Sequence, residues 1–192
     1  MPANAALRDY LLSRRSVGQA FLRDPGPTED ELRDILTIAT RVPDHTKLTP
    51  WRLVIFEGEA RLRAGEKLAE IARRRNPAIE EAALEAERRQ FLPSPLVVGV
   101  IHSHRPSPKA PEIEQLLSAG NVAFNLVHGA NALGFGANWV SRWFTFDLEA
   151  QEMLGARAGE RFIGFVHIGT VVAKPEDRPR PPLDSIVCRW PG

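Results

Sequence analysis

The 192-residue sequence predicts one globular domain in which helices and β-strands pack around a long buried helix. Three observations support this prediction. From Gln115 to Ser141 the chain contains no Asp, Glu, Lys or Arg, which indicates a helix shielded from water. Two continuous apolar runs, residues 95–102 and 161–172, have the length and composition of buried strands. The length also falls within the usual size of one domain, roughly 100–200 residues.

Composition narrows the classes of function. Hydrophobic residues make up 43% and charged residues 26% of the chain, as in ordinary soluble proteins. The formal net charge of +1 provides no overall field for nucleic acid or an anionic membrane, so we expect neither as a partner. The single cysteine, Cys188, excludes a disulfide within the chain and suits a reducing cytoplasm, and we expect its thiol to be packed. The N-terminal sequence has no apolar run preceded by basic residues, which predicts no secretory signal.

The first third of the chain predicts two helices and a strand. An amphipathic helix is expected over about residues 4–13. A second helix begins at Thr28, which stands at capping-box spacing from Glu31, and it ends before Pro43. The apolar stripe of this second helix consists of Leu32, Ile35, Leu36 and Ala39. Residues 51–58 (WRLVIFEG) predict a strand.

The charged middle of the chain predicts a helical surface. Residues 59–90, rich in Glu, Arg and Ala, predict two helices broken at the Asn-Pro-Ala of residues 76–78. Arginines 73–75 are interleaved with glutamates on neighbouring faces, so we interpret them as a solvated surface rather than a nucleic-acid site. Residues 95–102 then predict a central strand.

The charge-free segment predicts a helix over about residues 112–133. Its length alone would suit a membrane span. It contains several amides, however, and burying them in lipid without partners would be costly. We therefore expect a helix buried on all sides within the protein or within a subunit interface.

The last third predicts a turn and short strand at 134–141, a short helix capped by Asp147, and a long core strand at 161–172. The tail that follows is rich in proline. Its apolar end, residues 185–190 (SIVCRW), is strand-like, and we expect it to pair with another subunit.

No familiar catalytic motif is visible in the sequence. Gly134 and Gly136 begin like a dinucleotide fingerprint, but Trp139 stands at the third glycine position and a helix precedes them. His102 and His104 would share one face of a strand, yet no third ligand is evident, so we expect an exposed strand end and no metal site. We assign no catalytic side chain. Such a chain often leaves its chemistry to an organic cofactor.

Arg14, Arg15 and Ser16 stand where the first helix is expected to stop. Two guanidinium groups and a hydroxyl can bind a phosphate through charge-assisted hydrogen bonds, each contributing about 1.5–3 kcal/mol. Alternatively, the arginines cap the helix, because a helix C-terminus favours cations. This stretch alone supports both interpretations.

Two further stretches are candidates for a binding site. The loop from Arg41 to Trp51 presents Arg41 and His45 and is stiffened by two prolines, as expected of a ligand-binding loop or of a structural turn. The glycine-containing turn at 134–136 permits close approach to the backbone. It is followed by Trp139, Val140, Ser141 and Arg142. Trp139 alone suits a core position as well as a cofactor contact.

In this order, the stretches resemble the FMN-dependent nitroreductase superfamily, and most closely its short bacterial NAD(P)H nitroreductases. The residues that carry the resemblance are RRS at 14–16, R-x-P-D-H…PW at 41–51, EIEQLLSAGNVAFNLV at 112–127, LGFGANWVS at 133–141 and IGTVVAKPEDRPRPPLDSIV at 168–187. The resemblance extends over nearly the whole chain and rests on the order of the motifs rather than on one of them.

The resemblance implies an α+β fold, with a central mixed or antiparallel sheet flanked by helices. It implies a single FMN-binding domain over residues 1–192, with 174–192 as a C-terminal extension whose strand is exchanged with the partner of a homodimer. By position, Arg14, Arg15 and Ser16 would hold FMN. Arg41 and His45 would reach the same flavin from the other subunit, and Trp139, Val140 and Ser141 would complete the site. Relatives often carry Arg at the position of Val140, whereas here Arg142 stands two residues later.

The resemblance also implies an activity. Tightly bound FMN would accept hydride from NAD(P)H and reduce nitroaromatics, quinones or similar flat acceptors by a ping-pong reaction. Two alternatives stay open at this point. One is a non-catalytic FMN carrier, and the other is a flavin-fragmenting or dehalogenating member of the same superfamily.

Overall fold

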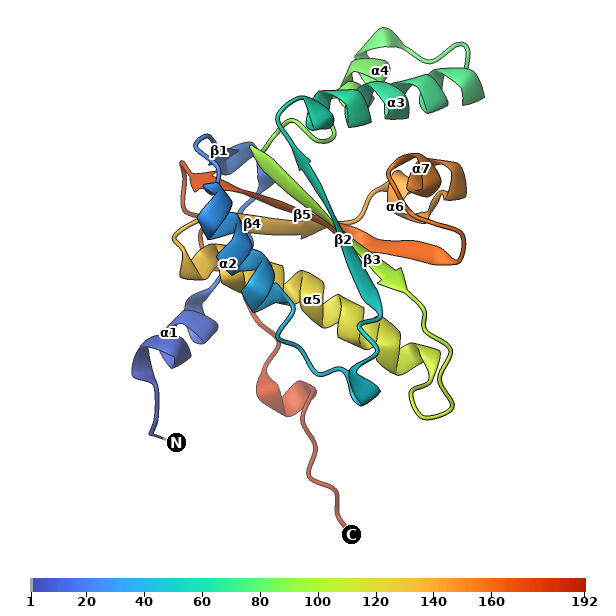
Figure 1. Ribbon diagram of the computed structural model, residues 1–192. Helices are drawn as coiled ribbons and strands as arrows, with labels where there is room; N and C mark the ends of the chain where they lie inside the picture. Colours follow the sequence, from blue (N-terminus) through green and yellow to red (C-terminus); the bar gives the residue numbers. More distant parts are fainter. Residues whose placement is uncertain (1) are drawn as a thin grey trace.

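The computed structural model describes residues 2–192, and its centre is a β-sheet with helices on both faces (Figure 1). The strands are β1 (Leu22–Arg23), β2 (Trp51–Glu57), β3 (Leu96–Ser103), β4 (Gly136–Val140) and β5 (Glu160–Val171). The helices are α1 (Ala5–Ser13), α2 (Glu29–Ala39), α3 (Glu59–Arg75), α4 (Glu81–Arg88), α5 (Glu112–Ala132), α6 (Trp143–Phe146) and α7 (Leu148–Met153). Short 3₁₀ turns occupy Gln19–Phe21, His45–Lys47 and Leu183–Ser185.

Strand β5 is the centre of the sheet. It pairs antiparallel with β1, β3 and β4, and β3 pairs antiparallel with β2. The register places Val166 opposite both Val98 of β3 and Trp139 of β4. Every residue of β3 is buried, as its continuous apolar sequence predicts. The expected mixed or antiparallel sheet is therefore antiparallel.

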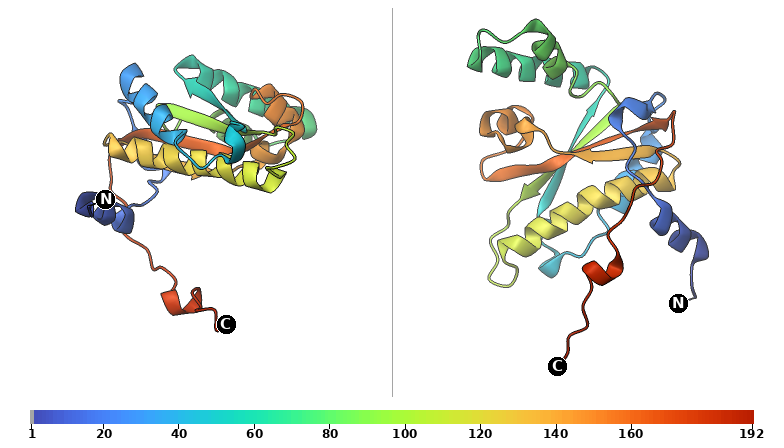
Figure 2. Two further views of the ribbon diagram at one scale, coloured as in Figure 1. Left: turned by 60° about the horizontal axis from the view of Figure 1, so that its bottom comes forward. Right: turned by 180° about the vertical axis from the view of Figure 1, so that it is seen from behind.

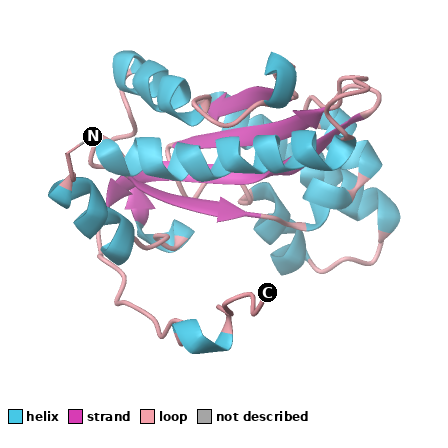
Figure 3. Cartoon of the chain, turned by 90° about the horizontal axis from the view of Figure 1, so that it is seen from below, coloured by secondary structure: helices cyan, strands magenta, loops and turns pink. Residues whose placement is uncertain are grey.

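Two apolar cores lie on opposite faces of the sheet. Helices α2 and α5 cover one face, and α5 lies along the strands (Figures 2 and 3). The helices cross closely, because a Cβ at Gly129 would lie 3.1 Å from the carbonyl oxygen of Ile35. The other face packs against α3, α6 and α7 through an aromatic cluster in which Phe165 contacts Phe56, Phe91 and Phe144.

The local signals in the sequence produced the expected elements. The capping box of α2 is present, with the Glu31 backbone N–H donating to Thr28 Oγ1 and the Thr28 N–H donating to Glu31. Asp147 caps α7 by accepting from the backbone N–H of Ala150 at 3.0 Å. Helix α6 was not predicted, because its four residues are too few to show a period.

Helix α5 is not buried on all sides. One face packs on the sheet, but Leu117 is 61% exposed and Phe124 is 43% exposed. The lack of charge along this helix therefore has two causes, since one face lies in the core and an apolar stripe on another face remains open. Within residues 2–192, no helix is both long and apolar enough to cross a membrane.

Two other predictions were wrong in detail. His102 is buried rather than at an exposed strand end, because β3 is covered along its whole length. Cys188 is exposed and not packed. Residues 185–190 form no strand, because the tail leaves the body of the molecule and finds no strand edge within the single chain (Figures 1 and 2). Whether this segment pairs with a second subunit stays a prediction.

Candidate functional site

Helix α1 ends at Arg14, which leaves helical geometry while its backbone N–H still donates to Tyr10 at 2.8 Å. Arg14 thus occupies the C-cap position through its backbone, which leaves its side chain for other contacts. The guanidinium carbon lies 5.6 Å from the centre of the Phe124 ring. Nη2 lies 3.5 Å from Ser16 Oγ, at the limit of a hydrogen bond. Nε is buried and has no hydrogen-bond partner among the residues that the structure describes. A buried guanidinium donor without an acceptor suits a missing anion.

Arg15 lies against the C-terminal tail. Its Nη1 donates to the backbone oxygen of Glu176 and lies 3.4 Å from Asp177 Oδ1. The pKa of the Asp177 carboxyl is lowered, first by the backbone N–H of Arg178 and also by Arg15. Only 21% of the Arg15 side chain is exposed. The neighbouring arginines therefore have different surroundings. Arg14 contacts Phe124 of α5, whereas Arg15 contacts Glu176 and Asp177 at the start of the C-terminal tail.

Both arginines line a cavity of about 620 Å³, which we call the arginine cleft. Its lining residues are Tyr10, Ser13, Arg14, Arg15, Val17, Asn131, Gly134, Phe135, Gly136, Val171, Lys174, Pro175 and Asp177. Lys174 adds a third cation, and Asp177 is the one carboxylate among these residues. The cleft therefore carries an excess of positive charge over negative charge, as a site for an anionic group requires.

The residues at the end of β4 and just after it point in different directions. Trp139 is 37% exposed on the α5 side, while Val140 packs against the aromatic cluster on the opposite face. A Cβ at Gly164 would lie 2.3 Å from Trp139 Nε1, so the indole needs a glycine beside it. Ser141 is exposed. Arg142 donates from Nη2 to Gln19 Oε1 at 3.3 Å, which ties the end of β4 to the loop after α1.

Trp139 lines a larger and more apolar cavity of about 810 Å³, which we call the apolar pocket. Its lining residues are Leu116, Leu117, Gly120, Asn121, Phe124, Trp139, Thr145, Phe146, Leu148, Gln151, Arg161, Phe162 and Ile163. Its one cation, Arg161, is paired with Glu112 at 2.7 Å. Phe124 belongs to the pocket and also lies against Arg14, so this contact connects a wall of the pocket with a wall of the arginine cleft. Aromatic walls with few polar groups suit a flat, uncharged ligand.

Arg41 and His45 lie elsewhere in the chain. Nδ1 of His45 lies 2.7 Å from Glu114 Oε2 at the start of α5. The carbonyl of Arg41 accepts from Asn125 Nδ2 at 3.1 Å, and its side chain is exposed. Neither residue lines the arginine cleft or the apolar pocket. Within one chain, the predicted site residues therefore form two separate groups.

Sequence reasoning missed several residues of the site. Phe124 lies in the charge-free helix, and nothing in the sequence distinguishes this exposed phenylalanine from the buried apolar residues around it. Tyr10 falls within the helix expected over residues 4–13 and was given no role in the site, but its hydroxyl lies 2.8 Å from His128 Nδ1 and the residue lines the cleft. Burial, followed by the charge of Arg14, lowers the pKa of His128, which keeps the imidazole neutral near pH 7. Lys174 lies in the tail, and only the folded chain brings it beside the arginines.

Among residues 2–192, no group of three or more His, Cys, Asp or Glu side chains is placed to hold a metal ion. His102 and His104 lie with ring centres 6.2 Å apart.

Comparison with known proteins gives a consistent picture. A family model described as "Nitroreductase family" matches residues 11–170. The "Putative NAD(P)H nitroreductase YdjA" of Escherichia coli strain K12 is 32% identical over 162 residues, which cover 84% of this chain and 86% of the relative.

Solved structures share the fold. A nitroreductase-like family protein from Bacillus cereus superimposes with a TM-score of 0.80 at 23% identity and covers 100% of both chains. A protein of Desulfovibrio desulfuricans described as "a putative nitroreductase in complex with fmn" gives a TM-score of 0.73 at 17% identity, and the match covers 100% of this chain and 99% of that one.

Proposed function

Because the chain belongs to the nitroreductase family, we propose that it is an NAD(P)H-dependent FMN oxidoreductase whose site is completed by a second copy of the chain. The observation that carries the proposal is the arrangement at Arg14. Among residues 2–192 its buried Nε has no hydrogen-bond partner, although a hydroxyl lies near the same guanidinium. Arg14 lines a cationic cleft and also contacts Phe124 of the apolar pocket. An amphiphilic cofactor with a phosphate at one end and a flat ring at the other needs both environments.

The residues present fit FMN. Arg14 and Ser16 would hold its phosphate end, with Lys174 and Arg15 adding positive charge to the cleft. Trp139, Val140 and Ser141 would complete the site on the β4 side, and Arg142 supports that segment through Gln19. The D. desulfuricans structure contains FMN on the same fold, which supports this choice of cofactor.

The second copy accounts for Arg41 and His45. These residues lie apart from the cleft in one chain, so they can contribute to a shared site only from a partner. The start of α5 gives such a partner an apolar surface to bury, because Ile113 is 59% exposed there and does not line the apolar pocket. We propose that residues 1–192 act as one FMN-binding domain and that the extension 174–192 reaches the partner's sheet.

FMN, when bound, supplies the chemistry by taking two electrons as hydride from NAD(P)H and passing them to an acceptor. The protein would orient these partners. Trp139 and Phe124 offer flat apolar surfaces, and the pocket has no unpaired charge among its lining residues. Nitroaromatics and quinones have this flat, electron-poor form, and we propose them as the acceptor class. Dependence on NAD(P)H is consistent with a reducing cytoplasm, which we propose as the location.

Steady-state kinetics tests the proposal. Purified protein reconstituted with FMN should oxidise NADPH or NADH when a quinone is supplied. Initial rates at several fixed quinone concentrations should give parallel double-reciprocal lines, as expected when the donor leaves before the acceptor binds. Protein that binds FMN but oxidises neither nucleotide would favour a flavin carrier. Conversion of reduced flavin in oxygen to a fragmented product would favour the flavin-fragmenting class.

A further inference from the structure

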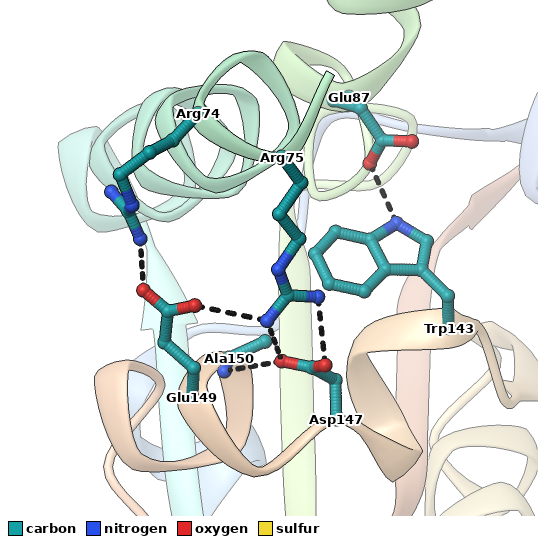
Figure 4. A network of polar contacts seen from close by, with 7 residues as sticks. All are labelled: Arg74, Arg75, Glu87, Trp143, Asp147, Glu149 and Ala150. Carbon is teal, nitrogen blue, oxygen red and sulfur yellow. Dashed lines mark hydrogen bonds and ion pairs between the residues drawn. The ribbon is translucent and has the colours of Figure 1, made fainter.

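A dense polar network lies outside the proposed cofactor site, where α3 and α4 meet α6 and α7 (Figure 4). Arg75, the last residue of α3, binds Asp147 through two hydrogen bonds of 2.8 and 2.9 Å. The same guanidinium reaches Glu149 at 2.9 Å. Arg74 pairs with the other oxygen of Glu149. We call this set of four residues the clasp.

An indole adds a second contact. The guanidinium carbon of Arg75 lies 5.7 Å from the centre of the Trp143 ring. Nε1 of Trp143 donates to Glu87 of α4 at 3.0 Å, as Figure 4 shows. Both helices of the α3–α4 hairpin are therefore tied to the α6–α7 segment. A single exposed ion pair contributes little, but a bidentate pair within a network fixes direction as well as distance.

Helices α3 and α4 pack tightly against each other. A Cβ at Gly65 would lie 1.9 Å from the carbonyl oxygen of Arg88. The Arg88 side chain pairs in turn with Glu66, Glu81 and Glu85. The hairpin therefore holds Arg75 at a defined place above α7.

The segment held by the clasp forms one wall of the apolar pocket. Thr145, Phe146, Leu148 and Gln151 line the pocket, and Asp147 lies in the middle of this run. Phe144 and Ala150 anchor the wall to the core, and Gln151 Oε1 accepts from the backbone N–H of Phe162 at 2.9 Å. Phe146 and Leu148, by contrast, are largely exposed and have little packing of their own. Their position depends on the backbone at Asp147.

We propose that Arg75 is a positioning residue that fixes the α6–α7 wall of the apolar pocket and thereby sets the size of acceptor that the pocket takes. This inference rests on the proposed function. Arg75 does not line the pocket itself. It acts through Asp147, which it holds by two hydrogen bonds, and through Glu149 two residues later.

The test compares Arg75→Ala with Arg75→Lys and with Arg73→Ala as a matched control. Arg73 lies on the same helix but pairs with Glu81, inside the hairpin. Each protein is assayed with NADPH, using 1,4-benzoquinone as a compact acceptor and menadione as a bulky one. In Arg75→Ala, the ratio of kcat/KM for menadione to that for benzoquinone should rise about fivefold, through KM, as expected from the loss of a contact network of this strength. Arg75→Lys should restore the ratio in part, because an ammonium cannot make the bidentate contact.

A second readout does not depend on turnover. Amide hydrogen exchange over residues 143–153 should be faster in Arg75→Ala than in wild type and unchanged in Arg73→Ala. If Arg75→Ala does not fold, Glu149→Gln removes one clasp carboxylate, leaves the Asp147 cap intact and should shift both readouts in the same direction. An acceptor ratio and exchange pattern equal to those of Arg73→Ala would overturn the proposal. Wild-type protein that takes up no FMN would instead refute the proposed function, while the exchange data would still report on the clasp.

Discussion

The guanidinium carbon of Arg14 lies 5.6 Å from the centre of the Phe124 ring, and this contact joins the end of α1 to the open face of α5. Phe124 is also part of the apolar pocket, while Arg14 lines the arginine cleft. One residue pair therefore links a cationic environment to an aromatic one. We therefore expect substitutions of Arg14 to lower the affinity for FMN more than they lower the stability of the fold.

Replacing Arg14 should weaken flavin binding. Loss of its charge-assisted hydrogen bonds, each about 1.5–3 kcal/mol, predicts a Kd for FMN in Arg14→Ala that is about 10- to 100-fold higher. Titration of apoprotein, followed by quenching of FMN fluorescence, measures this change. Arg8→Ala is the control, because Arg8 lies on the same helix and pairs with Asp9. Arg15→Ala should also weaken binding, but less, since Arg15 already pairs with the tail. Unchanged affinity in both Arg14→Ala and Arg15→Ala would contradict the phosphate assignment.

A site built from two chains predicts complementation between inactive variants. Arg14→Ala and Arg41→Ala should each lose activity as homodimers. In a mixed dimer, one site contains both substitutions and the other contains neither, so one intact site returns. Unfolding and refolding the two variants together should recover about a quarter of wild-type activity, because about half of the dimers are mixed. Activity no higher than that of the separate variants would place Arg41 outside the shared site.

The Arg52–Glu160 pair should make stability depend on acid pH. The hydrogen bond from Arg52, at 2.5 Å, is the main cause that lowers the pKa of Glu160 from 4.5 to about 2. Because the pKa is lower in the folded state, the stabilisation is present above about pH 4.5 and is lost as the pH falls toward 2. It amounts to at most about 3 kcal/mol.

Glu160→Gln should therefore reduce the free energy of unfolding in urea at pH 7, and its difference from wild type should shrink toward pH 2. Glu57→Gln is the control, because Glu57 is exposed and makes no ion pair with the described residues. If the free energy of unfolding of Glu160→Gln depends on pH in parallel with that of wild type, the Arg52–Glu160 pair does not contribute to acid stability.

The capping box of α2 predicts a purely structural effect. Thr28→Ala removes the acceptor for the Glu31 N–H and should lower the free energy of unfolding by about 1 kcal/mol. Thr37→Ala on the same helix should change it by less than about 0.5 kcal/mol. Urea titrations of both variants give the comparison. FMN affinity should be the same in both, and a loss of affinity in Thr28→Ala would mean that α2 contacts the cofactor more directly than its position suggests.

Local sequence signals were sufficient for most of the fold. The capping residues Thr28 and Asp147 mark helix starts through contacts within one turn, and the apolar run of β3 identifies a strand that is covered on both faces. Helix α5 shows the limit of such signals. Its lack of charge is equally consistent with a core and with an interface, and only the tertiary structure shows that Phe124 faces outward.

The candidate site was less accessible from the sequence than the fold. Arg14, Trp139, Arg41 and His45 could be proposed as site residues because each belongs to a recognisable sequence motif. The resemblance also assigned Arg41 and His45 to the other subunit's contribution. The contact between Arg15 and Asp177 joins residues 162 positions apart, and no local pattern encodes such a contact. The clasp at Arg75 was missed for the same reason, since arginines 73–75 looked like an ordinary solvated helix end.

The most direct test of the central claim is the visible absorption spectrum of the freshly purified protein under anaerobic conditions, before and after addition of NADPH. A flavin-dependent oxidoreductase should show flavin bands that bleach when the nucleotide is added. Flavin bands that persist with both NADPH and NADH would contradict the reductase activity, and a colourless protein that also fails to take up added FMN would contradict the cofactor site itself.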